Sequence, residues 1–154
     1  MTLIKSISGI RGTIGGAPSD NLTPIDIVKF ASSYGTWISQ KSDNKKIVVG
    51  RDARISGPMV QDLIVNTLIG LGINVVDLEL ATTPTVEMAV VAENAAGGII
   101  ITASHNPKQW NALKLLNEKG EFISGADGEA ILEIAEKGEF TFATVDHLGT
   151  LTKT

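Results

Sequence analysis

Cysteine is absent from the 154-residue sequence, and this absence excludes several kinds of site. A chain without cysteine has no disulfide, no thiolate metal site and no cysteine nucleophile. The two histidines, His105 and His147, are too few for a histidine metal cluster. A chain without disulfides also fits the cytoplasm, which is where we expect this protein to work.

Long apolar runs and clusters of basic residues are missing as well. No stretch approaches the ~20 apolar residues of a membrane span, and the N-terminus lacks the apolar core of a signal peptide. The formal net charge is −4, which argues against nucleic acid as a partner. We therefore expect neither a membrane nor a nucleic-acid partner. A small anionic ligand stays open, because its binding depends on local cations rather than on net charge.

Several catalytic templates are absent too. The sequence has no G-x-S-x-G elbow for a hydrolase serine, no G-x-G-x-x-G and no G-K-[ST] of a P-loop. A hydrolase-type serine is therefore the weakest of the functional alternatives. What is present is the composition of a globular domain, with 43% hydrophobic residues.

Hydrophobic periodicity predicts strands that alternate with helices. We expect strands at residues 7–11, 46–50, 73–80 and 97–102. A helix capped by Thr23 should run to about Gln40, a second should follow residues 56–58 and include Val60 to Leu71, and a third should span 84–93. This βαβαβ order predicts a parallel sheet between helices. The predicted fold is a three-layer α/β/α arrangement with a mixed, mostly parallel sheet of about four strands.

The C-terminal part of the sequence is less regular. Residues 112–116 and 121–123 flank a turn at 118–120 and resemble a hairpin, which would make the sheet mixed. Ser124 should cap a last helix, with Asp127 as the acidic half of a capping-box-like start, and this helix should end near Gly138. Residues 139–154 show no convincing helix or closing element. We therefore divide the chain into a domain at residues 1–140 and, at residues 141–154, the start of a connection to a further domain.

The predicted topology gathers three turns at one edge of the sheet. The strands should deliver residues 51–54, 81–84 and 102–107 to this edge, where ligands bind in open α/β sheets. A hydroxyl, an imidazole and a carboxamide lie side by side there in Ser104, His105 and Asn106, and Pro107 stiffens their turn. This edge is therefore the predicted functional site.

Each candidate residue also has a structural interpretation. Ser104 can be an ordinary turn residue, and His105 a hydrogen-bonded surface histidine. Asp52 and Arg54 can pin the turn after residues 46–50. Lys114 can be an edge-strand charge that prevents aggregation. Considered one at a time, these residues leave both interpretations open.

Four segments together are more specific than any single residue. Residues 8–12 read Ser-Gly-Ile-Arg-Gly, residues 50–54 Gly-Arg-Asp-Ala-Arg, residues 102–107 Thr-Ala-Ser-His-Asn-Pro and residues 110–114 Trp-Asn-Ala-Leu-Lys. In content and order they closely resemble motifs of the α-D-phosphohexomutases, the phosphoglucomutase/phosphomannomutase superfamily. Two positions depart from the family pattern. Residues 6–8 stand where many members have Phe-Gly-Thr or an aromatic-Asp pair, and Ala112 replaces a frequent glycine. Both departures concern the substrate side of the site.

The resemblance implies the first domain of a four-domain enzyme that interconverts hexose 1- and 6-phosphates through a phosphoserine and a sugar bisphosphate. Besides the phosphosugar substrate, the partners of this domain would be the remaining domains of the same enzyme. Those domains carry an aspartate-rich magnesium loop and the sugar-binding and phosphate-binding loops. None of those motifs occurs here, so we expect the chain alone to be inactive. A non-catalytic α/β domain that binds a phosphorylated small molecule remains the alternative.

The resemblance also implies roles for individual residues. Ser104 would carry the phosphoryl group and contribute one ligand to Mg²⁺, whose other ligands lie on another domain, and a sugar bisphosphate would act as activator. Lys114 and His105 are the general acid/base candidates, Lys114 by the closer family match. The candidates for binding phosphate are Arg11, Asn106 and Arg51, although a structural role is favoured for Arg51.

Overall fold

One mixed sheet runs through the computed structural model, which describes residues 1–6 and 9–154. Its strands lie in the order β1-β2-β6-β5-β3-β4-β7. Their bounds are β1 Ile4–Ser6, β2 Gly9–Thr13, β3 Lys46–Arg51, β4 Asn74–Leu80, β5 Gly97–Ile101, β6 Trp110–Leu116 and β7 Leu151–Lys153. The helices are α1 Pro24–Lys41, α2 Gly57–Gly70, α3 Thr83–Ala92 and α4 Gly125–Lys137, with a short 3₁₀ helix at Val145–His147.

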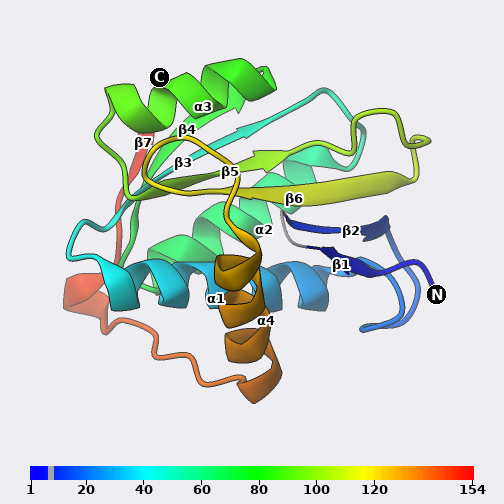
Figure 1. Ribbon diagram of the computed structural model, residues 1–154, viewed down its shortest axis with the longest axis horizontal. Coiled ribbons are helices and arrows are strands. Elements are labelled where there is room, and N and C mark those ends of the chain that lie inside the picture. The colour runs from blue at the N-terminus through cyan, green and yellow to red at the C-terminus, as the bar shows by residue number, and fades with distance from the viewer. Residues whose placement is uncertain (7–8) are drawn as a thin grey trace.

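The helices cover the two faces of the sheet unequally (Figure 1). Helices α1 and α2 pack on one face in a large apolar cluster, and α4 packs against α1. Helix α3 covers the other face with a smaller cluster over β3, β4 and β5. The predicted three-layer arrangement is confirmed, and α3 leaves part of its face of the sheet open beside β6 and β2.

Local sequence signals account for the helix ends. Thr23 and Asp26 form a complete capping box at the start of α1, and Pro24 takes the first helical position, where it loses no hydrogen bond. For α4, the amide of Asp127 donates to the Ser124 hydroxyl at 3.2 Å, and Gly138 ends the helix in the left-handed conformation. The helices and the parallel strands β3, β4 and β5 therefore start and end close to the predicted residues.

The sheet is larger and less parallel than predicted. Among the described residues, β3–β4, β3–β5 and β4–β7 pair in parallel, whereas β1–β2, β2–β6 and β5–β6 are antiparallel. The strand expected at residues 7–11 is found at Gly9–Thr13, and its first two residues lie outside the described ones. Strands β1 and β7 are short and exposed, so they lack the hydrophobic periodicity from which a strand can be predicted.

Two C-terminal predictions are corrected. The expected hairpin is reduced to one bridge between Leu116 and Phe122, because β6 instead pairs along its length with β5 and β2. Residues 139–154 do contain a closing element, since β7 extends the sheet in parallel with β4. The amide of Gly149 donates to Ile69 O at 2.9 Å and helps to hold this segment.

Tyr34 ties α1 to the sheet from inside the core. Its side chain is fully buried, and its hydroxyl donates to Leu116 O at 2.5 Å and accepts from the amide of Gly98 at 2.9 Å. A Cβ at position 97 would lie 2.1 Å from this hydroxyl, so only glycine at position 97 leaves room for the Tyr34 side chain. Burial raises the pKa of Tyr34 far above its ordinary value.

We expect Tyr34→Phe to cost about 1–3 kcal/mol at neutral pH, because it leaves buried backbone groups without their partner. Tyr34 is the single tyrosine. Above pH 10 the unfolded chain loses this proton while the folded chain keeps it. Above pH 10 the free energy of unfolding of the wild type should therefore fall by up to about 1.4 kcal/mol more per pH unit than that of Tyr34→Phe. Urea unfolding of both proteins at pH 9 and pH 11 measures this difference, and equal losses in the two would contradict it.

Candidate functional site

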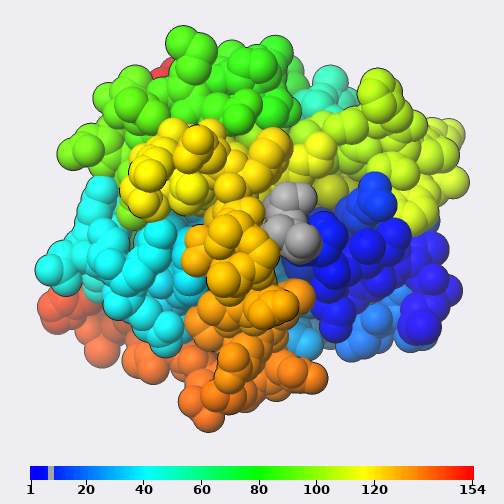
Figure 2. Space-filling view, in the orientation of Figure 1, coloured from blue at the N-terminus to red at the C-terminus, as the bar shows by residue number. Residues whose placement is uncertain are grey.

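The carboxyl ends of β3, β4 and β5 meet at one edge of the sheet, as the sequence predicts. The amide of Asp52 donates to Ile101 O at 3.1 Å, and the amide of Ala81 donates to Arg51 O at 3.0 Å. The Thr102 hydroxyl donates to the Asp52 carboxylate at 2.7 Å. These bonds join the loop after β3 to residues 102–107, which we call the serine loop. In the space-filling view this loop lies in the yellow-green region, above the blue N-terminal strands (Figure 2).

Ser104 has an unusual backbone conformation for an exposed serine. Its φ is +52°, in the left-handed region, and its amide donates to the Thr102 hydroxyl at 3.2 Å. A non-glycine residue in this region costs about 1–2 kcal/mol, so its surroundings must hold it there. The serine loop therefore presents the Ser104 hydroxyl in a conformation that local preference alone would not favour.

Arg54 holds the serine loop through backbone carbonyls. One guanidinium nitrogen donates to Pro107 O at 2.7 Å and Trp110 O at 3.1 Å, and the other donates to Ser104 O at 2.8 Å and Asn106 O at 2.7 Å. The sequence suggested only that Arg54 pins its own turn with Asp52. The available signal in the sequence was the second arginine of Gly-Arg-Asp-Ala-Arg. Its guanidinium has five donors in a fixed arrangement, which suits it to bind several carbonyls at once; we call this contact the Arg54 clamp.

Replacing Arg54 with lysine should loosen the serine loop, because one ammonium group cannot reach four carbonyls. The amide of Trp110 donates to Pro107 O at 3.0 Å and reports on the loop. We expect its hydrogen exchange to accelerate about tenfold or more, the equivalent of one lost charge-assisted bond. Arg11→Lys is the matched control, since Arg11 is exposed on β2. Equal exchange rates at Trp110 in the wild type and Arg54→Lys would refute the role of the clamp.

Lys114 contacts the serine directly. Its ammonium group donates to Ser104 Oγ at 2.8 Å. Lys114 lies in the middle of β6, which pairs with β5 on one side and β2 on the other. The interpretation of Lys114 as an edge-strand charge is therefore wrong, because β6 is an interior strand. A lysine in such a strand, half-buried and aimed at a serine hydroxyl, fits a chemical role better.

Arg11 lies on the same open face of the sheet as Lys114. In the register of β2 and β6, Gly9 pairs with Lys114 and Arg11 pairs with Ala112, so the two cations are diagonal neighbours on one face. Both line a hollow of about 290 Å³. Two neighbouring cations, of which Lys114 contacts an exposed hydroxyl, form a surface that suits an anion such as phosphate.

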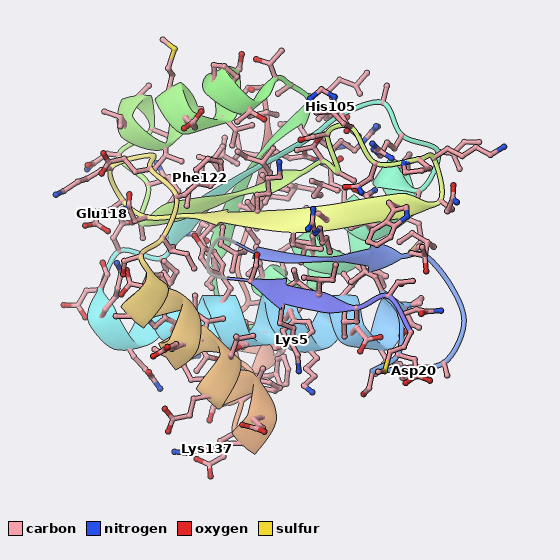
Figure 3. All side chains as sticks on the ribbon, turned by 45° about the vertical axis from the view of Figure 1, so that its right-hand side comes forward. Lys5, Asp20, His105, Glu118, Phe122 and Lys137 are labelled. Carbon is pink, nitrogen blue, oxygen red and sulfur yellow. The ribbon has the colours of Figure 1, made fainter. Side chains whose placement is uncertain are left out.

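The remaining serine-loop candidates are placed differently. His105 is exposed, and Figure 3 shows it on the opposite side of the sheet from Lys137 of α4. Among residues 1–6 and 9–154, no side-chain hydrogen bond engages its ring. Asn106 is half-buried, its amide donates to Ala103 O at 3.0 Å, and its carbonyl accepts from Arg54. The described contacts of Asn106 are therefore made by its backbone.

Arg51 is engaged inside the protein. Its Nε donates to Gln61 Oε1 at 2.6 Å, and one terminal nitrogen donates to Asp52 O at 3.2 Å. These bonds favour the structural alternative for Arg51. Asn111 is a residue that sequence reasoning missed. Its fully buried side chain donates to the Ser56 hydroxyl at 2.8 Å and so ties β6 to the start of α2.

The described residues do not form a metal site by themselves. Within residues 1–6 and 9–154, no group of three or more acidic, histidine or cysteine side chains is placed to hold an ion. The nearby Asp52 carboxylate already accepts from Thr102 and from the amide of Arg54. Ser104 Oγ could supply one oxygen ligand, but its described partner is a cation. A Mg²⁺ ion at Ser104 would therefore need carboxylates from elsewhere.

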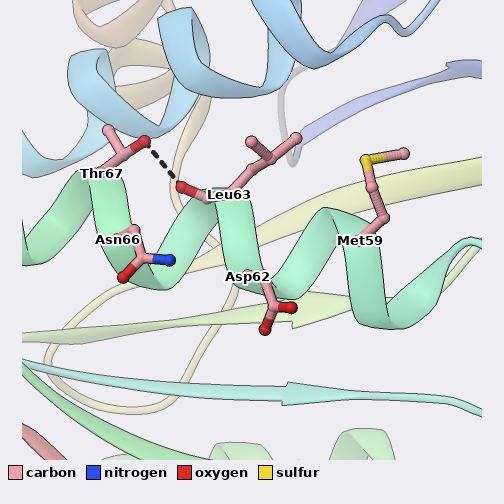
Figure 4. A pocket seen from close by; sticks show the side chains of 5 residues that line it. All are labelled: Met59, Asp62, Leu63, Asn66 and Thr67. Atoms are coloured by element: carbon pink, nitrogen blue, oxygen red, sulfur yellow. Dashed lines mark hydrogen bonds between the residues drawn. The ribbon is translucent and has the colours of Figure 1, made fainter.

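A second hollow lies along α2, away from these residues. It has a volume of about 680 Å³ and is lined by Met59, Asp62, Leu63, Asn66 and Thr67 (Figure 4). None of the described candidate residues lines it. In the same described residues, no helix has both the length and the apolar character needed to cross a bilayer.

Comparisons with known proteins agree with this fold. A family model described as phosphoglucomutase/phosphomannomutase, alpha/beta/alpha domain I, matches residues 3–142. A phosphoglucomutase/phosphomannomutase of Thermococcus kodakarensis is 34% identical over 92% of this chain and 32% of its own length. A phosphoglucosamine mutase of Ligilactobacillus salivarius is 36% identical over 91% of this chain and 32% of its own.

A solved structure agrees as well. The chain of a protein from Thermus thermophilus, assigned as a phosphomannomutase, superposes with a TM-score of 0.83 at 27% identity. The match covers 100% of this chain and 34% of that one. The present chain thus spans about a third of the length of the relatives it matches.

Proposed function

Because the chain belongs to the phosphoglucomutase/phosphomannomutase family and matches its domain I, we propose that it is the phosphoryl-carrying domain of a phosphosugar mutase. The substrates are hexose 1- and 6-phosphates, the further domains of the enzyme complete the site, and the enzyme works in the cytoplasm. The observation that carries the proposal is the Lys114 ammonium group on Ser104 Oγ at 2.8 Å, at the edge where the sheet presents its loops.

In the proposed cycle the phosphoryl group moves from Ser104 Oγ to the free hydroxyl of a hexose monophosphate. The bond between phosphorus and Ser104 Oγ breaks as a bond from the sugar oxygen forms. The resulting bisphosphate then returns its other phosphoryl group to Ser104, and an added sugar bisphosphate activates the enzyme by loading the serine. A phosphoserine carries about −1.5 to −2 charges. Lys114 and Arg11 supply positive charge beside it, which is the main requirement of phosphoryl transfer besides positioning.

Lys114 acts at the serine oxygen in this proposal. Its ammonium group supplies the proton that Ser104 Oγ needs when the phosphoryl group departs, and takes a proton back when the group returns. His105 is the second acid/base candidate, for the sugar hydroxyl. Its exposed ring supports this role, because nothing among the described residues engages it. Arg11 and Asn106 are the proposed phosphate contacts.

A Mg²⁺ ion, if bound at Ser104, supplies charge neutralisation at the phosphoryl oxygens. The described residues do not fit a complete site for it, so its carboxylate ligands must come from further domains. What this chain contributes is the position of the serine oxygen, held by the Arg54 clamp and the Thr102 hydroxyl.

Intact mass spectrometry tests the proposal. The full-length protein is incubated with a hexose 1,6-bisphosphate, and its mass should rise by one phosphoryl group that maps to Ser104. Ser104→Ala provides the blank. Reversible binding of the bisphosphate without a gain in mass would favour the alternative, a non-catalytic domain that binds a phosphorylated small molecule.

The 154-residue chain alone should fold but not turn over substrate. Its apolar clusters lie within the described residues, whereas those residues lack the carboxylates for a metal. We expect a cooperative thermal transition together with no interconversion of glucose 1-phosphate and glucose 6-phosphate in a coupled assay. Measurable turnover by this chain would show that the site needs no further domain.

A further inference from the structure

A chain of buried polar side chains lies behind the serine loop. Gln61 of α2 is 4% exposed, and its Oε1 accepts from Arg51 Nε at 2.6 Å. Its Nε2 donates to the carboxylate of Asp77 in β4, which is 6% exposed. Gln61 therefore joins a cation on β3 to a buried carboxylate on β4, and the described ion pairs do not include a direct one between them.

The chemistry of its neighbours gives Gln61 one orientation. An arginine can only donate and an ionised carboxylate can only accept, so the amide oxygen must face Arg51 and the amide nitrogen Asp77. A flip of the amide would break both bonds and leave buried polar atoms unpaired, which is costly. The side chain is thus a connector with a defined direction.

The Asp77 end of this connector is anchored in irregular backbone. The register between β3 and β4 shifts at Val49 and Gly50, and Glu79 has a φ of +58°. The amide of Glu79 donates to Asp77 Oδ1 at 2.8 Å. Bulges of this kind often lie beside functional sites and redirect neighbouring groups. Asp77 therefore serves as a fixed acceptor on which Gln61 can be held.

The Arg51 end leads to the serine. Besides Gln61, the Arg51 guanidinium contacts Asp52 O at 3.2 Å. The Asp52 carboxylate accepts from the Thr102 hydroxyl, whose oxygen in turn accepts from the amide of Ser104. A continuous series of hydrogen bonds, which crosses residue Asp52 from its carbonyl oxygen to its carboxylate, therefore runs from the buried Asp77 carboxylate to Ser104.

We propose that Gln61 is a positioning residue for the serine loop. By fixing the Arg51 side chain, it fixes the Asp52 peptide, and through Asp52 and Thr102 it holds the backbone of Ser104. Gln61 itself touches neither the hollow at Lys114 nor the serine. Its effect on the loop is independent of the reaction, whereas its effect on phosphoryl transfer rests on the proposed function.

The first test is Gln61→Met, which keeps a similar shape and removes both hydrogen bonds. In the full-length protein we expect exchange of the Ser104 amide to accelerate about tenfold, the equivalent of one hydrogen bond to a charged group. We also expect kcat to fall about tenfold with KM unchanged, because the variant alters the position of the serine rather than a substrate contact. Unchanged Ser104 exchange would overturn the proposal.

A matched control separates positioning from general destabilisation. Thr67 lies on the same helix, is also buried, and its hydroxyl donates to Leu63 O at 2.7 Å (Figure 4). Thr67→Val removes that bond and should lower the melting temperature without changing Ser104 exchange or kcat. If Thr67→Val accelerates Ser104 exchange as much as Gln61→Met does, the effect is general and the proposal is wrong.

A pair of substitutions tests the direction of the connector and covers the case in which Gln61→Met does not fold. Gln61→Glu keeps the acceptor for Arg51 but sets a carboxylate against Asp77, so we expect faster exchange at Ser104. Adding Asp77→Asn places a donor opposite the new carboxylate but gives up the bond from the Glu79 amide, so exchange should return only part of the way to the wild-type rate. A double variant no closer to the wild type than Gln61→Glu overturns the proposal.

These readouts also separate the positioning role of Gln61 from the proposed phosphoryl-transfer function. If the wild type gains no phosphoryl group from a hexose 1,6-bisphosphate, the proposed function fails, and Ser104 exchange still decides the role of Gln61. If the wild type is phosphorylated and Gln61→Met leaves exchange unchanged, only the positioning role fails.

Discussion

Replacing Ser104 with alanine is expected to reduce phosphosugar turnover by the full-length enzyme to background. The variant removes the oxygen proposed to carry the phosphoryl group, and no other hydroxyl is described within hydrogen-bond distance of the Lys114 ammonium group. The free energy of unfolding should stay within about 0.5 kcal/mol of the wild type, since the side chain is exposed and alanine tolerates the backbone comparably. A coupled assay and urea unfolding measure the two quantities.

Ser19 offers a matched control for this experiment. It is another exposed serine in the left-handed region, with a φ of +72°. Ser19→Ala should leave both turnover and stability near the wild type. Near-normal turnover by Ser104→Ala would exclude the phosphoserine mechanism, and loss of turnover in Ser19→Ala would show that the assay reports the backbone change instead.

Lys114→Met should lower kcat by about 10²–10⁴-fold, the usual contribution of a positioned acid/base group. The melting temperature should be unchanged or higher, because β6 is an interior strand and methionine suits its apolar neighbours without a charge to keep hydrated. Steady-state kinetics and a thermal melt on the full-length protein check both expectations.

Lys46→Met is the control for removing a half-buried strand lysine. Lys46 lies in β3 of the same sheet, and its ammonium group donates to Glu93 O at 3.2 Å, away from the serine loop. Its substitution should leave kcat close to the wild type. A Lys114→Met enzyme with a lower melting temperature and an unaltered kcat would assign Lys114 a structural role and withdraw the catalytic one.

The helices and the central strands could be predicted because their signals are local. The capping box of Thr23 and Asp26 lies within one turn, and the apolar run of β5 is contiguous in the sequence. The sheet edge of the candidate site follows from them, because parallel strands in a right-handed βαβ topology place their carboxyl ends together. The motif around Ser104 indicated the family, which the comparisons confirm.

Other features depended on residues far apart in the chain. Strand β7 pairs with β4 across more than 70 residues, and Arg54 reaches carbonyls about 50 residues away. An exposed three-residue strand shows no hydrophobic periodicity. The sequence position of an arginine does not indicate which carbonyls its side chain will contact. Reading the sequence therefore missed the edge strands of the sheet and the clamp on the serine loop.

The sequence by itself determined the layered α/β/α core, the edge where the loops gather and the identity of the serine loop, because each depends on short-range patterns of apolar and capping residues. Only the tertiary structure decided that Lys114 lies in an interior strand with its ammonium group on Ser104, that Arg54 contacts the carbonyls of the serine loop, and that Gln61 joins Arg51 to Asp77 behind this loop. The physical reason is that strand order and side-chain hydrogen bonds depend on residues far apart in the sequence. Their donors and acceptors come together only in the folded chain.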